Sequence, residues 1–375
     1  MSEVKQPIRI PMFYPYVPES AIEKVVEVLK GRWVGQGPKV DEFELEFSKK
    51  FGIQYATSVN SATSALRLAY AVAGVGVGDE VITTPYTMVA TNTTILEQNA
   101  KPVFADVQYE TANISPDDIE HRITKKTKAI ACVDWAGYPC DLDEIRKIAF
   151  EHDLPLIEDS AHALGAVYKN KPIGSISDFT VFSFQAIKHM TTGDGGMLCM
   201  TNKENYDEAV RRKWFGIDRA ARKPSVLGND PTFDITEVGY KYHMNDIAAA
   251  MGLGQLPHFE SNFKRRAEIA KIYREELEKV TKITLLESEN DRISANWLFA
   301  MHVKDRLQFA NQMRSKGIEV AVHNWRNDKY SIFGGLRKDL PNTARLDETL
   351  ICIPLHTKLS DEDVDYIIAS VKKGW

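Results

Sequence analysis

Short apolar runs of strand length alternate with helical patterns over the first two thirds of the chain. Several of these runs have almost no polar interruption, which is typical of strands buried on both faces of a sheet. We therefore expect a sheet that is covered by helices on both sides. The predicted strands are residues 81–83, 103–106, 129–133, 156–159, 180–184 and 197–200.

Three helix candidates between these strands begin at residue types that cap helices or start their first turn. Strands that alternate with helices in this way predict a mostly parallel α/β sheet. The helix starts and the apolar patterns that follow them are Ser61 before 65–73, Ser115 and Pro116 before Ile119, and Asp141 before 145–150.

The pattern changes in the last third of the chain. A long charged helix is expected over 261–280, because its apolar residues recur three or four positions apart. Shorter strands and helices follow it, so we expect a large α/β domain over 1–256 and a smaller α+β domain over 257–375. A further amphipathic helix over 22–29 is expected to pack near the small domain or across a subunit interface.

Composition narrows the function classes. A length of 375 residues predicts two or three domains at about 150 residues each. With 43% hydrophobic and 26% charged residues, the chain is neither disordered nor collagen-like. A net charge of -5 and an isoelectric point near 6.0 exclude a global positive field, so nucleic acid is not expected as the main partner.

The cysteines and the chain start bear on compartment. Cys132, Cys140, Cys199 and Cys352 are too far apart in sequence for a zinc site or a redox dithiol, and they are expected to be buried thiols of a reducing cytosol. Residues 1–10 lack the apolar stretch of a secretory signal. No run approaches the roughly 18 apolar residues of a membrane helix. We expect a cytoplasmic protein without metal or membrane contact.

Two segments rich in small residues have different interpretations. Residues 74–79 look like a dinucleotide loop, but they follow a helix and precede a strand, so we interpret them as a turn. Over 58–65, small hydroxyl residues open a helix, where the free amides of Ala62 and Thr63 would suit a phosphate. An ordinary helix cap is the alternative.

Two further groups follow buried strands. Asp159 ends the run at 156–159, where open α/β sheets have their ligand crevice. Lys188 follows the strand at 180–184, and a buried lysine has the lowered pKa of an amine that forms Schiff bases. A surface lysine is the alternative. Together with the phosphate candidate, these groups match the three requirements of pyridoxal phosphate (PLP): an anion site, an acid for the ring nitrogen and a lysine for the aldehyde.

The chain resembles the DegT/DnrJ/StrS family of PLP-dependent sugar aminotransferases, of fold type I, over nearly its whole length. The resemblance implies a large domain with a mostly parallel seven-stranded sheet flanked by helices, a smaller C-terminal α+β domain, and a homodimer whose sites are completed across the twofold axis. The stretches that carry it are 33–38 (WVGQGP), 60–66 (NSATSAL), 78–82 (GDEVI), 157–165 (IEDSAHALG), 182–196 and 239–242 (GYKY).

The resemblance assigns roles to individual residues. Lys188 would form the Schiff base with the cofactor and then move a proton between substrate and cofactor. Asp159 would pair with the ring nitrogen. The amides of Ala62 and Thr63, the Thr63 hydroxyl and Ser183 would hold the phosphate.

Some cofactor-side positions differ from the family pattern. His162 stands where relatives have Gln or His, near the ring oxygen or the substrate. Met88 replaces the usual aromatic ring against the cofactor, so a sulfur contact would replace stacking. Lys241 and His243 replace Asn and Arg in a segment that, in the family, reaches the neighbouring subunit's cofactor phosphate. Asp194 replaces a more frequent Glu.

The substrate side differs as well. The resemblance implies that Trp33 and His323 contact the substrate, although only the first His of a usual His-Tyr-x-x-x-His run is present at His323. Arg219, Arg222 and Arg326 are candidates for a diphosphate or carboxylate on the substrate. Exposed arginines without a ligand are the alternative.

The activity that the resemblance implies is transfer of an amino group from an amino acid such as L-glutamate to a nucleotide-linked keto-sugar. The sequence of residues 186–193 is more similar to the family members that aminate C4 of the sugar than to those that aminate C3. The alternatives are a sugar dehydratase, in which a histidine replaces Lys188, a non-catalytic cofactor-binding regulator, and an amino-acid aminotransferase. Lys188 argues against the dehydratase.

Overall fold

The computed structural model describes residues 8–219, 221–226 and 232–375. Its main sheet has seven strands in the order β1-β9-β8-β5-β4-β2-β3, and β9 alone runs in the opposite direction to the other six. This confirms the expected mostly parallel α/β fold. The strands are β1 (Tyr55–Val59), β2 (Glu80–Thr83), β3 (Lys101–Phe104), β4 (Thr127–Val133), β5 (Leu156–Asp159), β8 (Phe179–Ser183) and β9 (Gly196–Met200).

Successive residues of the central strands contribute to two different cores. In β4, Ile130 and Cys132 pack in one hydrophobic cluster, whereas Ala129 and Ala131 pack in another on the opposite face. This double burial explains why the strands have continuous apolar sequences. Six of the seven strands lie within two residues of the predicted ranges.

Strand β1 was not predicted, because Thr57 and Ser58 interrupt its apolar pattern. Both side chains are fully buried and donate hydrogen bonds to Glu44 Oε1, at 3.3 Å from Thr57 Oγ1 and 2.7 Å from Ser58 Oγ. Lys213 Nζ lies 2.8 Å from the same oxygen. The buried polar groups are therefore satisfied by an ion pair that sequence patterning does not reveal.

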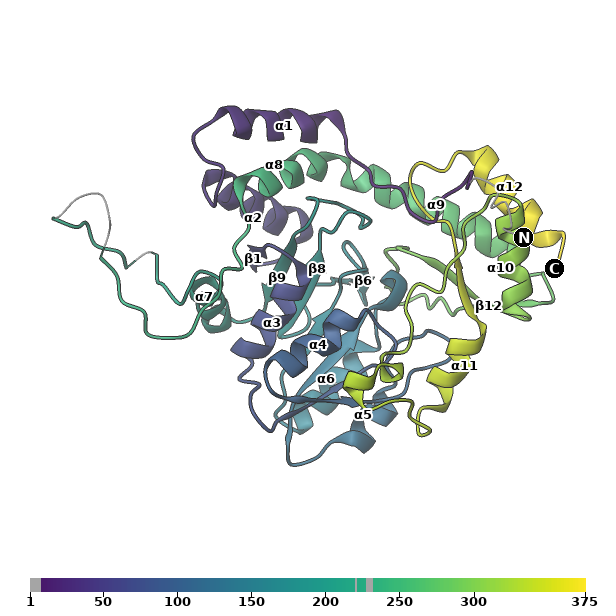
Figure 1. The fold of residues 1–375 in the computed structure, drawn as a ribbon, viewed down its shortest axis with the longest axis horizontal. Helices are drawn as coiled ribbons and strands as arrows, with labels where there is room; N and C mark the ends of the chain where they lie inside the picture. Colours follow the sequence, from purple (N-terminus) through teal and green to yellow (C-terminus); the bar gives the residue numbers. More distant parts are fainter. Residues whose placement is uncertain (1–7, 220, 227–231) are drawn as a thin grey trace.

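Helices cover both faces of the main sheet (Figure 1). The Ser61 cap is confirmed by the hydrogen bond that its side chain accepts from Ser64 N. Asp141 also precedes its helix, but its carboxylate bonds Gln108 and Arg292 instead of the helix amides. One face holds α2 (Pro38–Phe51), α5 (Pro116–Arg122) and α6 (Leu142–Glu151), and the other holds α3 (Ala62–Val72), α4 (Val89–Glu97) and α7 (Lys203–Arg212).

The last third builds a separate core around a three-stranded sheet in the order β10-β12-β13. Ile10 from the start of the chain also packs in this core. The division at residue 256 stays a prediction. The elements are α9 (Phe259–Leu277), β10 (Ile283–Leu285), β12 (Phe299–Val303), α10 (Arg306–Ser315), α11 (Pro341–Thr349), β13 (Leu350–Ile353) and α12 (Asp361–Lys372), with a small sheet of β6 (Val167–Tyr168), β7 (Lys171–Pro172) and β11 (Arg292–Ile293).

The N-terminal helix α1 (Glu19–Lys30) packs against α8 (Asp246–Gln255) (Figure 1). Ser20 Oγ donates a hydrogen bond of 2.8 Å to Gly254 O. The helix therefore rests on α8 rather than on the C-terminal sheet, and its place at a subunit interface stays a prediction. Its other face leaves Ile22, Val26 and Leu29 exposed.

Between α7 and α8 the described residues 214–219, 221–226 and 232–242 project from the body as an arm (Figure 1). Antiparallel bridges join Ile217 to Ile235 and Lys223 to Thr232 within the arm. Among the described residues, no helix has both the length and the apolarity needed to cross a membrane.

The contact of α1 with α8 gives a test of the fold. A Cβ on Gly254 would lie 2.3 Å from Ala21 Cα, so Gly254→Ala should force the helices apart and lower the free energy of unfolding by about 1–3 kcal/mol. Gly76→Ala is the matched control, because a Cβ there meets nothing within 4 Å. Urea unfolding of both variants measures the difference. Equal stability would contradict this packing.

Candidate active site

Asp159 ends β5 at the edge of the sheet, and the chain turns immediately after it. Asp134 fixes this turn, because its Oδ2 accepts a hydrogen bond of 2.8 Å from Ser160 Oγ and its Oδ1 accepts one of 2.9 Å from Cys140 N. Asp134 N also donates to Asp159 O at 3.2 Å. The backbone that carries Asp159 is therefore tied to the end of β4.

The Asp159 carboxylate is buried and has two direct donors. Thr91 Oγ1 donates to its Oδ2 at 2.7 Å, and Ala161 N donates to its Oδ1 at 3.2 Å. Burial raises the pKa of Asp159, whereas these two donors and the charge of Lys188 lower it. The charged form of Asp159 is thus stabilised only by Thr91, the Ala161 amide and Lys188 among the described residues.

Lys188 lies in the loop after β8, with its Nζ 3.8 Å from the ring centroid of Trp297. Trp297 is fully buried, and its Nε1 donates a 3.0 Å hydrogen bond to Ile187 O. Burial lowers the pKa of Lys188 to about 7, and the nearby Asp159 only partly opposes this shift. About half of the amine is therefore neutral at pH 7, which is the form that a nucleophile or base requires.

His162 and His323 meet on the same tryptophan. The His162 ring stacks on Trp297 with centroids 3.7 Å apart, and the His323 ring meets Trp297 edge-on at 4.5 Å. Burial lowers the pKa of His162 well below its usual value and that of His323 to about 3, so both rings are neutral. His162 Nδ1 is buried with no hydrogen-bond partner among the described residues. A ligand oxygen or donor would satisfy it.

The first turn of α3 forms a cradle with β8 and β9. Ser183 pairs with Gly196 across these strands, and a Cβ on Gly196 would lie 2.7 Å from Ala62 N. Among the described residues, none accepts a hydrogen bond from the amides of Ala62 or Thr63. Free amides at a helix N-terminus attract an anion, so this cradle fits a phosphate.

Lys241 and Met88 lie beside these groups. Asn60, just before the α3 cap, donates from its backbone N to Tyr242 O at 2.7 Å and from Nδ2 to Lys241 O at 3.3 Å. The Lys241 side chain itself is exposed at the base of the arm. Met88 is the exposed N-cap residue of α4, one turn before Thr91.

The predicted substrate residues are not all close to this cluster. Trp33 is exposed between α1 and α2, and Arg219 lies on the arm with its guanidinium 5.3 Å from the Trp214 ring. The interpretation of Arg326 as a ligand for the substrate is wrong. Its guanidinium is buried in a two-point ion pair with Asp328, at 2.7 and 2.6 Å, so it is committed to an internal partner.

Sequence reasoning missed Trp297 and Thr91. Trp297 belongs to the C-terminal third, and only the folded chain brings it beneath Lys188. Thr91 lies in α4, whose sequence VATNTTILE shows little helical periodicity. The one available signal in the sequence was the concentration of Thr and Asn residues in this apolar segment, which need hydrogen-bond partners if they are buried.

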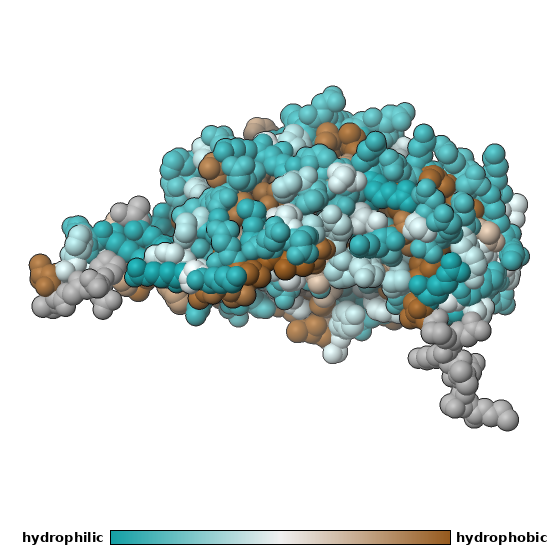
Figure 2. All heavy atoms as spheres, turned by 90° about the horizontal axis from the view of Figure 1, so that it is seen from above, coloured by the Kyte–Doolittle hydropathy of each residue, from teal (hydrophilic) through white to brown (hydrophobic). Residues whose placement is uncertain are grey.

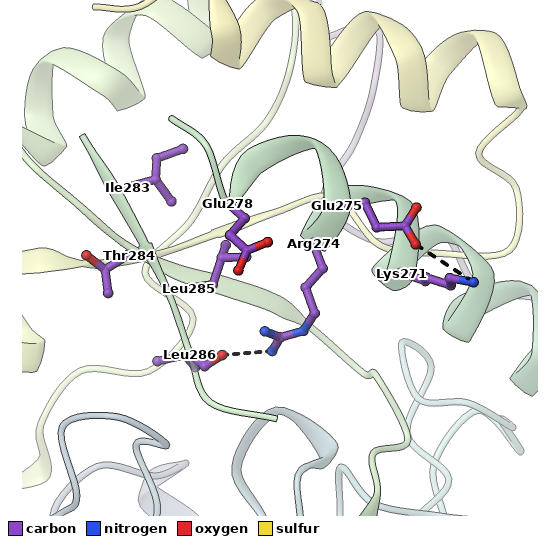
Figure 3. Close-up of a pocket in the computed structure, with 8 residues that line it drawn as sticks. All are labelled: Lys271, Arg274, Glu275, Glu278, Ile283, Thr284, Leu285 and Leu286. Carbon is purple, nitrogen blue, oxygen red and sulfur yellow. Dashed lines mark hydrogen bonds and ion pairs between the residues drawn. The ribbon is translucent and has the colours of Figure 1, made fainter. Parts of the chain in front are cut away.

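Pockets give a second view of the surface. A pocket of about 570 Å³ lies between the end of α9 and β10 (Figure 3), and none of the predicted site residues lines it. A pocket of about 310 Å³ includes Asn60, Thr192 and Asp194 and lies next to the α3 cradle. Among the described residues, no group of three or more His, Cys, Asp and Glu side chains could hold a metal ion.

Comparison with known proteins identifies the family. The model of the DegT/DnrJ/EryC1/StrS aminotransferase family matches residues 15–372. The chain belongs to this family. The UDP-4-amino-4-deoxy-L-arabinose–oxoglutarate aminotransferase of Shewanella sediminis is 34% identical, over 97% of this chain and 96% of that one.

Solved structures agree with this assignment. The sugar aminotransferase CalS13 from Micromonospora echinospora has a TM-score of 0.92 and 32% identity, over 98% of this chain and 100% of that one. Spr1654 from Streptococcus pneumoniae, solved in a PLP form, has a TM-score of 0.90 and 33% identity, over 97% of this chain and 98% of that one. This DegT family member is therefore an enzyme of the sugar aminotransferase class, whose members are PLP-dependent.

The lowered pKa of Lys188 in this DegT family member can be measured directly. In protein stripped of bound small molecules, labelling of Lys188 by acetic anhydride should rise with a midpoint near pH 7, as the neutral amine grows from about a tenth at pH 6 to about nine tenths at pH 8. Mass spectrometry identifies the site. Lys203, whose pKa Asp207 raises, is the control and should label weakly throughout. A Lys188 midpoint near pH 10 would contradict the burial argument.

Proposed function

We propose that this protein is a PLP-dependent aminotransferase that converts a nucleotide-linked keto-sugar, at C4, to an amino-sugar, with L-glutamate as donor. The observation that carries the proposal is the combination of a half-neutral Lys188 with a buried Asp159 carboxylate and an open helix N-terminus. The Shewanella relative supports the chemistry, since its name gives a 4-amino sugar and oxoglutarate, the oxo acid of glutamate.

The donor groups of the site fit pyridoxal phosphate. The amides of Ala62 and Thr63, with Ser183, would hold the phosphate, and Asp159 would hold the ring nitrogen. His162 Nδ1, buried without a partner among the described residues, would bond the ring oxygen. When bound, the cofactor supplies an aldehyde carbon that carries the amino group and a protonated ring that withdraws electrons.

Lys188 would act as the base and then as the acid. Its Nζ is neutral in about half of the molecules at pH 7, so it can take the proton from Cα of the amino donor. It can later give a proton to the carbon of the sugar that receives the amine. Trp297 would exclude water beneath Nζ, which keeps the pKa of Lys188 near the working pH.

The acceptor side of the proposal rests on exposed and aromatic groups. The His323 ring contacts Trp297. Burial and the charge of the nearby Lys188 lower the pKa of His323. We expect His323 to contact the sugar. Trp33 and Arg219 would contact the nucleotide part of the substrate. All four cysteines are buried free thiols, which supports the cytoplasm as the compartment.

We also propose a homodimer in which Lys241 reaches the phosphate cradle of the partner. The arm carries exposed Phe215, Phe233 and Val238, and Figure 2 shows apolar side chains at its tip and along the edge that continues from its base. Exposed apolar residues on a projecting segment are typical of an interface.

The first test of the proposal is the half-reaction with the donor. L-glutamate should shift the absorbance of the PLP-loaded protein from the visible to the near ultraviolet and release oxoglutarate. Lys188→Ala should slow this shift roughly 100- to 10,000-fold, because the proton-moving amine is lost. Lys203→Ala, an exposed lysine on α7, is the control and should react normally. A normal rate in Lys188→Ala would overturn the assignment.

The dimer can be tested by mixing inactive variants. If Lys241 acts in the partner's site, Lys188→Ala and Lys241→Ala chains unfolded and refolded together at equal amounts should recover about a quarter of the activity. Half of the dimers are then mixed, and each mixed dimer has one intact site. No recovery, or a monomer by light scattering at full activity, would contradict this arrangement.

A further inference from the structure

We propose that Thr91 is a positioning residue whose hydroxyl, fixed by Thr87, holds Asp159 as an oriented carboxylate for the pyridine nitrogen. The proposal rests on the proposed function, because it assumes that Asp159 holds that nitrogen. It adds a role for Thr91 of α4 and for Thr87 in the loop before it. Thr91 touches Asp159 and acts through it.

The hydrogen-bond directions follow from the number of protons. Thr91 Oγ1 lies 2.7 Å from Asp159 Oδ2 and 2.9 Å from Thr87 Oγ1, and both threonines are buried. The carboxylate can only accept, so the single hydroxyl proton of Thr91 points to Asp159. Thr87 must then donate to Thr91. The bonds therefore run in one direction, from Thr87 to Thr91 to Asp159.

Other threonines of α4 behave differently. Thr93 Oγ1 donates to Val89 O at 3.1 Å, and Thr94 Oγ1 donates to Ala90 O at 2.8 Å. These are the usual bonds of a threonine to the carbonyl four residues earlier in its own helix. Thr91 instead directs its hydroxyl across to β5. This difference separates a role toward Asp159 from ordinary helix packing.

Asp159 needs such a donor, because no ion pair neutralises it within the described residues. Its two direct donors are Thr91 Oγ1 and the more distant Ala161 N. The hydrogen bond from Thr91 is the largest of the effects that lower the pKa of Asp159 against burial. Without it, more of the carboxyl would be protonated, and a neutral carboxyl forms no ion pair with a protonated ring nitrogen.

Asn327 anchors the loop that presents Thr87. Its backbone N donates to Pro85 O at 2.6 Å, and its Nδ2 donates to Thr87 O at 2.8 Å. Asn92 Nδ2 donates to Asn327 Oδ1 at 2.8 Å, and both amide side chains are buried. A continuous set of hydrogen bonds thus joins the C-terminal third, beside the Arg326–Asp328 pair, to Asp159.

The test measures PLP binding without any substrate. Dissociation constants for wild type, Thr91→Val and Thr91→Ser are measured by fluorescence titration from pH 5.5 to 9. Thr91→Val should bind PLP roughly 10-fold more weakly than wild type near pH 6, since one hydrogen bond to a charged group is lost. Because the lost hydrogen bond lowers the pKa of Asp159, the ratio should be larger at the acidic end of this range than at the basic end. Thr91→Ser, which keeps the hydroxyl, should restore most of the affinity.

One control variant and one further variant make the test specific to the hydrogen bonds that lead to Asp159. Thr94→Val removes a buried hydroxyl one turn further along α4 and should bind PLP as wild type does. Asn327→Ala should weaken binding with the same pH dependence, and its effect should be less than multiplicative with that of Thr91→Val, because both act through one set of hydrogen bonds.

The outcomes that overturn the proposal are distinct. If Asp159→Asn loses affinity while Thr91→Val matches wild type at every pH, Thr91 does not position Asp159. If Thr91→Val loses affinity equally at all pH values and Thr91→Ser does not restore it, the role of Thr91 is structural. If wild type binds no PLP, the proposed function fails and this inference fails with it.

Discussion

The arrangement of the site depends on the cost of removing a carboxylate and an amine from water at the same edge of a sheet. Burial raises the pKa of Asp159 and lowers that of Lys188, so it favours the neutral form of each group. Among the described residues, neither forms a salt bridge that would restore its charge. The pKa of Asp159 is lowered by Thr91, one backbone amide and the charge of Lys188, whereas burial lowers the pKa of Lys188, which lies against Trp297. This balance gives an amine that is half neutral near pH 7.

The fold creates this edge by burying its main sheet on both faces. Strands β5 and β8 are enclosed by two cores, so polar chemistry is confined to the loops that follow them. The first turn of α3 opens at the same edge, where the absence of a side chain at Gly196 lets β9 pack closely against the backbone of Ser61 and Ala62. The C-terminal third then supplies Trp297 and covers the lysine. The site therefore lies where segments far apart in sequence meet, and its electrostatics belong to no single segment.

The pattern of hydrophobic and polar residues predicted strands correctly where a single physical effect, burial on both faces of the sheet, dominated a segment. Continuous apolarity placed six strands to within two residues, because double burial admits almost nothing else. The pattern failed for β1, where an ion pair from other elements satisfies Thr57 and Ser58. It also failed for α4, whose many β-branched and polar residues hide the helical period. Arg326 was misjudged for a related reason, since its partner Asp328 sits two residues away but is buried only in the folded chain.

The sequence alone determined six strands of the main sheet and put Asp159 and Lys188 after strands and Ala62 and Thr63 at a helix start, because strand ends and helix starts are read from neighbouring residues. Only the tertiary structure decided which groups surround them. Trp297 beneath Lys188 and the bond from Thr91 to Asp159 each join residues more than 60 positions apart. A pKa depends on burial and on distances of a few ångströms, and these are set by packing rather than by spacing along the chain.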